Sequence, residues 1–239
     1  MSSKRERIHA RRQAQQRNRI LIITIVVVAA LGITALFVWP LLNHQVAAQT
    51  SNAIVTPVPH TYPQANGNAL GDPNAPVKIT EFADFQCPYC EQFYQNTEQQ
   101  VIDTYVATGK VYFVYRSVGA WIGPQSQSAA EAAYCAGDQN KFWQYHDMLF
   151  DNQTGENVGD FTDTHLTTFA QDLGLDMTAF NACYTSGKYA SRVAQDAKDA
   201  TAAGLTGTPG FAINGKVVLT GALPFASFQT TIEKALAGG

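Results

Sequence analysis

The chain has 239 residues and a net charge of −3, and 15 % of its residues are charged while 46 % are hydrophobic. This composition predicts a folded core and excludes a disordered chain. Seven Lys and Arg residues stand within residues 1–19, whereas the chain after residue 42 holds nine basic and 18 acidic residues. Such an acidic main part argues against nucleic-acid binding.

The N-terminal 42 residues have the pattern of a membrane anchor. Residues 1–19 form a basic tail, and residues 20–42 are 23 residues without a charged side chain. That length is enough to span a bilayer as a helix, and the basic flank places the tail in the cytoplasm and the rest of the chain outside. A cleaved signal peptide is the alternative, because Val46-Ala47-Ala48 resembles a cleavage site, although the apolar run is long for one. We therefore expect a single-pass membrane protein.

Residues 43–70 predict an extended linker between membrane and domain. This segment is rich in proline and small polar residues, and it contains His44 and His60, which we expect to be solvated. Residues 71–76 (Gly-Asp-Pro-Asn-Ala-Pro) have the composition of a turn ahead of the first main strand.

A pair of cysteines, Cys87 and Cys90, lies at a predicted strand-to-helix junction. The apolar run over residues 77–86 predicts a buried strand, and residues 91–108 carry apolar side chains at helical spacing, followed by Gly109 as a C-terminal cap. Pro88 suits the first position of that helix, because its missing N–H would be unpaired there in any case.

This placement predicts thiol–disulfide chemistry. The free amides and dipole of a helix N-terminus stabilise a thiolate, so the pKa of Cys87 should be lowered. Cys90, one turn later, is close enough to resolve a mixed disulfide on Cys87. The alternatives are a zinc half-site and a structural disulfide, but the chain has no second C-x-x-C and no pair of histidines at zinc-finger spacing.

Two acids precede the dithiol. Glu81 lies in the predicted strand among apolar residues, where burial would raise its pKa and let it exchange a proton with Cys90. A solvent-facing acid at the edge of the strand is the alternative, and the residues themselves leave both open. Asp84 is expected to be a loop or capping residue.

The next segments predict one strand and then a helical lobe. Residues 111–117 are rich in β-formers, so the strand–helix–strand order gives a right-handed crossover and a parallel pair. From about residue 124 to 204 the pattern is helical, punctuated by glycines. The expected helices are 125–136, 139–151, 164–173, 177–186 and 189–203.

Cys135 and Cys183 both fall in this helical lobe. In an exported chain an even cysteine count favours a disulfide between them, and two free buried cysteines are the alternative. His146 and His165 lie on or beside predicted helices, and we expect them to be packed or half-buried.

Strand character returns in residues 206–221, followed by a final helix over residues 224–237. Asn214-Gly215 between two β-forming runs predicts a hairpin. Pro209 removes a ladder hydrogen bond, so it should start the strand or adopt an unusual geometry such as a cis Thr208–Pro209 bond.

These motifs together resemble the DsbA-like branch of the thioredoxin superfamily, whose bacterial members are membrane-anchored or secreted. The likeness covers about residues 68–239 and rests on GDPNAPVKITEFADFQCPYC followed by TGTPGFAINGK. It implies an α/β thioredoxin-like fold over residues 71–239 with an inserted all-helical domain at about 119–204, preceded here by the transmembrane helix.

The resemblance also implies roles for the dithiol and the residues around it. Cys87 would be the exposed nucleophile, Cys90 the resolving cysteine, and Glu81 the buried acid that handles the Cys90 proton. Pro209 would be the cis-proline facing the dithiol, and the backbone of Thr208 would pair with an extended substrate segment.

The remaining residues of the motif would touch client proteins. Phe85, Pro88 and Tyr89 would supply apolar contacts to unfolded chains. Tyr89 stands where the strongly oxidising enterobacterial enzyme has a histidine, and tyrosine cannot carry the charge that helps stabilise the Cys87 thiolate, so the redox poise stays open.

The function implied is an extracytoplasmic thiol oxidase at the bacterial cell membrane. It would pass its Cys87–Cys90 disulfide to secreted proteins and be reoxidised by a quinone-linked membrane protein of the DsbB or vitamin K epoxide reductase type, with no metal or cofactor beyond the disulfide. A reductase or isomerase on the same scaffold is one alternative. A membrane-tethered chaperone or binding module with a structural 87–90 disulfide is another.

Overall fold

A computed structural model describes residues 54–238 of the chain. The predicted basic tail, the predicted transmembrane span over residues 20–42 and the first part of the predicted linker lie outside the described residues. Within residues 54–238, every helix is too short or too polar to cross a bilayer.

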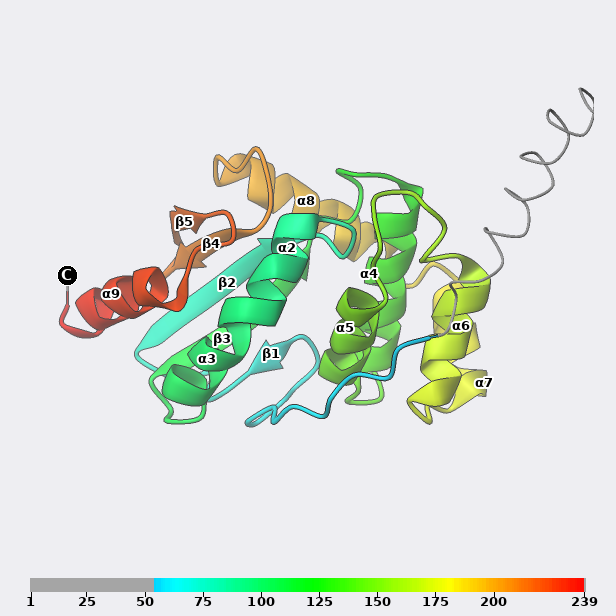
Figure 1. Ribbon diagram of the computed structural model, residues 1–239, viewed down its shortest axis with the longest axis horizontal. Coiled ribbons are helices and arrows are strands. Elements are labelled where there is room, and N and C mark those ends of the chain that lie inside the picture. The colour runs from blue at the N-terminus through cyan, green and yellow to red at the C-terminus, as the bar shows by residue number, and fades with distance from the viewer. Residues whose placement is uncertain (1–53, 239) are drawn as a thin grey trace, which may run out of the picture. The chain divides into compact units, whose positions relative to one another are not determined.

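The centre of the described part is a five-stranded sheet with strand order β1-β3-β2-β4-β5 (Figure 1). The strands are β1 (Ala69–Leu70), β2 (Val77–Ala83), β3 (Val111–Ser117), β4 (Gly210–Ile213) and β5 (Lys216–Thr220). β2 and β3 pair in parallel, as the predicted crossover requires, and the other neighbours are antiparallel. Asn214 and Gly215 both have positive φ at the β4–β5 turn, which confirms the predicted hairpin.

One face of the sheet is covered by the crossover helix and the C-terminal helix. The crossover runs without interruption through α2 (Pro88–Phe93), a π-helical turn η1 (Tyr94–Glu98), α3 (Gln99–Val101) and a second π-helical turn η2 (Ile102–Val106). The sequence predicted this helix but not its two wide turns. α9 (Phe225–Leu236) packs beside it, and the rings of Phe93, Phe211 and Phe228 meet between helices and sheet.

The opposite face of the sheet is covered by α8 (Ala190–Ala202). Here Phe82 and Ala212 of the sheet pack with Ala200 of α8 and Leu205 after it. Because side chains alternate along a strand, Phe82 points to α8 while its neighbour Glu81 points to the crossover helix.

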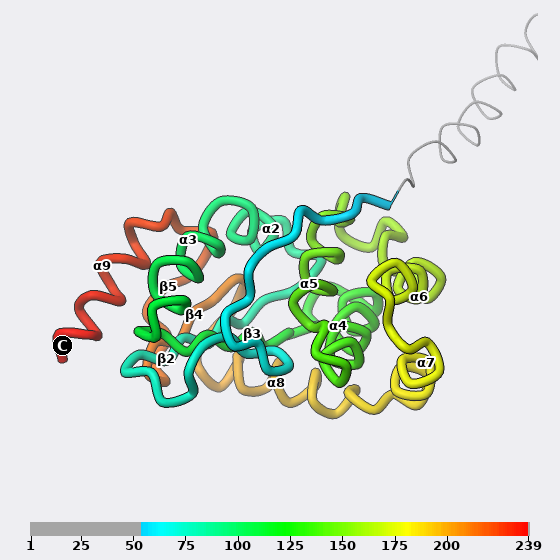
Figure 2. The backbone as a smooth tube through the Cα atoms, turned by 90° about the horizontal axis from the view of Figure 1, so that it is seen from below, coloured from blue at the N-terminus to red at the C-terminus, as the bar shows by residue number. Residues whose placement is uncertain are grey.

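The remaining helices form the inserted lobe beside the sheet (Figure 2). They are α4 (Pro124–Gly137), α5 (Phe142–Asp151), α6 (Asp163–Asp172) and α7 (Met177–Thr185). The predicted thioredoxin-like fold with a helical insertion is confirmed. α5 begins at Phe142 and not at the predicted residue 139, because Asn140 has a φ of 57° and the chain turns there.

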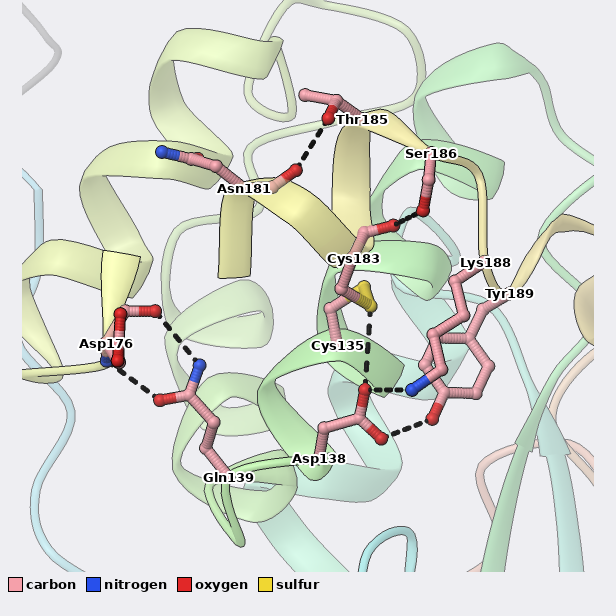
Figure 3. The surroundings of a disulfide bond; sticks show 10 residues. All are labelled: Cys135, Asp138, Gln139, Asp176, Asn181, Cys183, Thr185, Ser186, Lys188 and Tyr189. Carbon is pink, nitrogen blue, oxygen red and sulfur yellow. Dashed lines mark hydrogen bonds and ion pairs between the residues drawn. A yellow bond between two sulfur atoms is a disulfide. The ribbon is translucent and has the colours of Figure 1, made fainter. Parts of the chain in front are cut away.

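A disulfide joins Cys135 on α4 to Cys183 on α7, with the two Cα atoms 5.8 Å apart (Figure 3). Beside it, the carboxylate of Asp138 accepts hydrogen bonds from Lys188 at 2.6 Å and from the Tyr189 hydroxyl at 2.6 Å. These contacts tie the end of α4 to the segment that leads into α8.

The described residues ahead of β1 pack against the inserted lobe. The Val55 backbone and the Asn152 side chain exchange two hydrogen bonds, of 2.7 and 2.9 Å. Further along, the ring of Tyr62 stacks on Trp143 at a centroid distance of 6.2 Å. β1 then pairs with β3.

Candidate active site

The dithiol stands at the start of α2, where the sequence placed it. Cys87 is the N-cap residue, with extended backbone angles, and Pro88 is the first helical residue. The Cys87 carbonyl accepts the N–H groups of Cys90 at 3.0 Å and Glu91 at 3.1 Å, which starts the helix. Both thiols are free in this structure.

The two cysteines differ little in exposure. Cys90 is fully buried at 0 % exposure, and Cys87 is 6 % exposed. The prediction of an exposed nucleophile is therefore wrong for this reduced state. Cys87 is buried because another chain segment lies across the helix start, where the Thr208 carbonyl oxygen is 3.5 Å from the Cys87 sulfur.

The environment of Cys87 stabilises its thiolate. The pKa of Cys87 falls from 9.0 to about 6, first because the Cys90 thiol donates a hydrogen bond to its sulfur. Burial opposes the shift, while a hydrogen bond from the Thr208 side chain and the amides of Cys90 and Tyr89 add to it. The amides at the helix start contribute as predicted, but the neighbouring thiol is the larger cause.

Cys90 has the opposite character. Burial is the main cause that raises its pKa well above the ordinary value, and the hydrogen bond it donates to Cys87 acts in the same direction. The Asp84 amide donates a weak hydrogen bond to the Cys90 sulfur at 3.5 Å. The pair is thus divided into a ready thiolate and a thiol that holds its proton.

Glu81 is buried beneath this pair. It lies in register with Tyr115 of β3 and Phe211 of β4, and Phe211 packs on the crossover helix. Burial raises the pKa of Glu81 well above its usual value, and its charge raises the pKa of Cys90. One carboxylate oxygen is buried without a hydrogen-bond partner among the described residues. The alternative of a solvent-facing acid is therefore wrong.

The segment before β4 completes the site. The Thr208–Pro209 peptide bond is cis, and Thr208 is half-buried beside Cys87 while Pro209 is buried. The next residue, Gly210, is tightly packed, since a Cβ there would lie 2.4 Å from a methyl carbon of Leu205. This chain segment comes from far along the sequence to lie against the dithiol.

A second buried acid lies between β2 and α2, and the sequence did not predict its role. Asp84 makes no cap contact with the helix; its carboxylate accepts hydrogen bonds from the Gln86 amide at 2.9 Å and the Ser126 hydroxyl at 2.6 Å. Burial is the main cause that raises its pKa to about 7, and the Cys87 charge adds to the shift. The sequence signal that could have identified Asp84 is its position, because it is a charged residue between two apolar neighbours just ahead of the dithiol.

The three residues predicted to touch clients differ in position. Tyr89 is 62 % exposed and Pro88 is exposed beside it. Phe85 is fully buried, with its ring 5.0 Å from Tyr115 and 5.2 Å from Phe150, so the prediction that it contacts clients is wrong. It points away from the surface because it follows β2 inward and fills the space between the sheet and α5. Within residues 54–238, no three His, Cys, Asp or Glu side chains gather as metal ligands.

The family model described as Thioredoxin matches residues 64–234. The chain belongs to the thioredoxin family. Among solved structures, oxidised BdbD from Bacillus subtilis matches with a TM-score of 0.65 at 24 % identity, covering 77 % of this chain and 100 % of that one. α-DsbA1 from Wolbachia pipientis matches with a TM-score of 0.62 at 25 % identity, covering 74 % and 94 %. The predicted DsbA-like character is confirmed.

Two curated relatives extend the comparison. A putative protein-disulfide oxidoreductase from Rickettsia felis is 29 % identical over 190 residues, which cover 79 % of this chain and 67 % of the relative. The Na(+)/H(+) antiporter NhaA 3 from Salinispora tropica is 36 % identical over 147 residues, which cover 61 % of this chain and 21 % of the antiporter. The chain thus spans only about a fifth of that relative's length, and the likeness concerns that part alone.

Proposed function

We propose that this chain is a thiol:disulfide oxidoreductase that introduces disulfide bonds into secreted or surface proteins through Cys87 and Cys90. The observation that carries the proposal is the division of the pair: a Cys87 thiolate at a helix start beside a Cys90 thiol that keeps its proton. A structural disulfide or a binding module needs no such difference between its two sulfurs.

The exchange proceeds in two displacements. A client thiolate attacks the Cys87 sulfur of the oxidised pair, the Cys87–Cys90 bond breaks, and Cys90 leaves and takes up a proton from Glu81. A second client thiolate then attacks the client sulfur of the mixed disulfide. Cys87 leaves as a thiolate, so the client is oxidised by two electrons and the dithiol is reduced by two.

The low pKa of Cys87 favours this direction. Stabilising the thiolate stabilises the reduced enzyme, so the disulfide is given up more readily. Tyr89 contributes its backbone amide to this effect, and its exposed ring is free to contact a client. With Pro88 it forms an apolar rim, while the Thr208 backbone beside Cys87 offers hydrogen-bonding groups to an extended segment.

The location is the second part of the proposal. Residues 20–42 would anchor the chain in the bacterial cell membrane, with residues 1–19 in the cytoplasm and the thioredoxin-like domain outside. Oxidised clients leave a reduced dithiol behind, so a quinone-linked membrane protein of the DsbB or vitamin K epoxide reductase type would reoxidise it. The Cys87–Cys90 disulfide is the redox group in this proposal, which includes no further cofactor.

A client-oxidation assay tests the chemistry. The oxidised full-length chain is mixed with a reduced, unfolded protein, and the thiols lost by the client are counted by alkylation and mass spectrometry. Wild type should oxidise one client dithiol per chain, and Cys87→Ser should oxidise none. Reduced Cys90→Ser, activated on Cys87 by a mixed disulfide with a small aromatic thiol, should hold a client that carries a single thiol as a stable mixed disulfide, because neither Cys90 nor a second client thiolate is there to attack it. A Cys87→Ser chain with full activity would refute the proposal.

The reduction potential tests the direction. The chain is equilibrated in glutathione buffers, and the redox state of the peptide with Cys87 and Cys90 is read after alkylation. A potential well above the thioredoxin value of about −270 mV supports the oxidase. A value as low as that of thioredoxin would assign the chain as a reductase instead.

A further inference from the structure

The proton that Cys90 exchanges has no direct route to water. Cys90 is completely buried, and Glu81 beneath it is buried as well. Glu81 can supply one proton, but it must then be reprotonated before the next turnover. A buried acid that cycles therefore needs further groups between itself and solvent.

A second buried glutamate lies on the crossover helix, which is the helix that Glu81 faces. Glu98 closes the π-helical turn η1 of the crossover helix and is buried. Burial is the main cause that raises its pKa to about 8, and the charge of Glu81 raises it further, so the two acids sense each other. Glu98 is therefore protonated at neutral pH and able to pass a proton to Glu81.

A row of side chains leads from Glu98 toward the surface. The Oε2 atom of Glu98 faces Nε2 of His146 at 3.7 Å, and neither atom has a hydrogen-bond partner among the described residues. On its other side, Nδ1 of His146 is 3.0 Å from Oδ1 of Asp147. The second oxygen of Asp147 is 3.1 Å from Nδ1 of His60 and also accepts a hydrogen bond from the Tyr62 hydroxyl.

His60 is where this row reaches solvent. Its side chain is 29 % exposed, whereas His146 and Asp147 are buried. A narrow surface hollow is lined by seven residues: His60, Tyr62, Tyr94, Glu98, Gln99, Ile102 and Asp147. Both ends of the row, the buried acid and the outer histidine, are thus part of the lining of this hollow. Two further titratable groups, Tyr94 and Asp151, stand alongside.

We propose that Glu98, His146, Asp147 and His60 form a proton relay that connects Glu81 with solvent during thiol–disulfide exchange. When the Cys87–Cys90 bond opens, the Cys90 thiolate takes the Glu81 proton, Glu98 reprotonates Glu81, and a proton from water enters through His60. Reoxidation runs the same transfers in reverse, so no net charge stays inside the protein. The relay rests on the proposed function, because it serves the proton of that reaction.

The relay residues touch no client and act through Glu81, so they affect the rate of disulfide exchange and not the reduction potential of the Cys87–Cys90 pair. His60 is the best position to test, because it lies at the surface and its loss leaves the core intact. The full-length oxidised chain is mixed with dithiothreitol in dilute buffer, quenched with acid, and the reduction of the Cys87–Cys90 disulfide is followed by alkylation. The variants are His60→Gln and Glu98→Gln, with His165→Gln on α6 as the matched control.

The relay predicts that His60→Gln reduces the exchange rate about tenfold. This is less than the roughly 10²–10⁴-fold effect of a general acid or base that acts in the reacting step, because His60 is the outermost member of the row. Added imidazole should restore the His60→Gln rate in a concentration-dependent way and leave wild type unchanged. The reduction potential of His60→Gln should equal that of wild type. Glu98→Gln should be slow as well, but imidazole should not restore it, and His165→Gln should behave as wild type.

Other outcomes separate the two proposals. If wild type exchanges reversibly and His60→Gln is as fast, or is slow without rescue by imidazole, the relay is wrong while the oxidoreductase stands. If wild type shows no reversible Cys87–Cys90 couple, the proposed function itself fails. Should Glu98→Gln not fold, the His60→Gln rate, its rescue and its potential still decide the matter.

Discussion

Replacing Cys90 by alanine should raise the pKa of Cys87 from about 6 to between about 7 and 8. The largest cause of the low value is the hydrogen bond from the Cys90 thiol. A hydrogen bond to a charged group contributes about 1.5–3 kcal/mol, and one pKa unit corresponds to about 1.4 kcal/mol, so its loss costs about one to two units. The helix amides and Thr208 remain in the variant and keep the value below 9.0.

The measurement is the alkylation rate of Cys87 by iodoacetamide from pH 4 to 10. With Cys135 and Cys183 joined, Cys87 is the one free thiol of the Cys90→Ala variant. Cys90→Ser is the matched control, because its hydroxyl still donates a hydrogen bond and should hold the midpoint within about half a unit of wild type. A midpoint near 6 for Cys90→Ala would refute the reasoning and leave the helix start as the cause.

Three further predictions follow from the same structure. Changing Cys135 and Cys183 to serine should lower the free energy of unfolding by about 4 kcal/mol, the loop-closure value for their separation of 48 residues, without moving the Cys87 pKa; urea titration and alkylation check both. The pKa of Cys87 is lower in the folded than in the unfolded chain, so its thiolate stabilises the reduced protein above pH 9.0, and this contribution is lost as the pH falls to about 6. Urea titration should therefore show that the free energy of unfolding of the reduced form, relative to the oxidised form, falls by about 1 kcal/mol from pH 7.5 to 6; this value is discounted because solvent screens the partly buried thiolate. An equal pH dependence of both forms would contradict the prediction. Gly210→Ala should cost about 1–3 kcal/mol in the same measurement, because the new methyl group meets buried Leu205, and an unchanged stability would mean that the packing there can yield.

The local features of the chain were open to prediction because short-range physics sets them. The C-x-x-C pair falls where an apolar run gives way to helical spacing, and a proline favours the helix start. The Asn214-Gly215 turn needs positive φ at two positions, which these residues tolerate best, and both have it. The inserted helices follow from apolar periodicity interrupted by glycine.

The errors and omissions concern side chains whose setting depends on distant segments. Phe85 is hydrophobic and adjacent to the motif, so the sequence could not tell a client contact from a core residue; its burial is decided by α5, which packs on it. His60 lies in a proline-rich segment that predicts a solvated linker, yet Asp147 holds it against the lobe. The π-helical turn that ends at Glu98 also leaves no pattern that helical periodicity can detect.

The sequence alone determined where the dithiol lies: two cysteines at a helix start, with an acid in the strand before them. Tertiary structure alone decided how the two thiols are divided. Thr208 reaches Cys87 from 121 residues away, and the burial of Cys90 and Glu81 arises from packing between sheet and crossover helix. Burial and long-range contacts set a pKa through the loss of water and the nearby charges, and neither is encoded in the neighbouring residues of the chain.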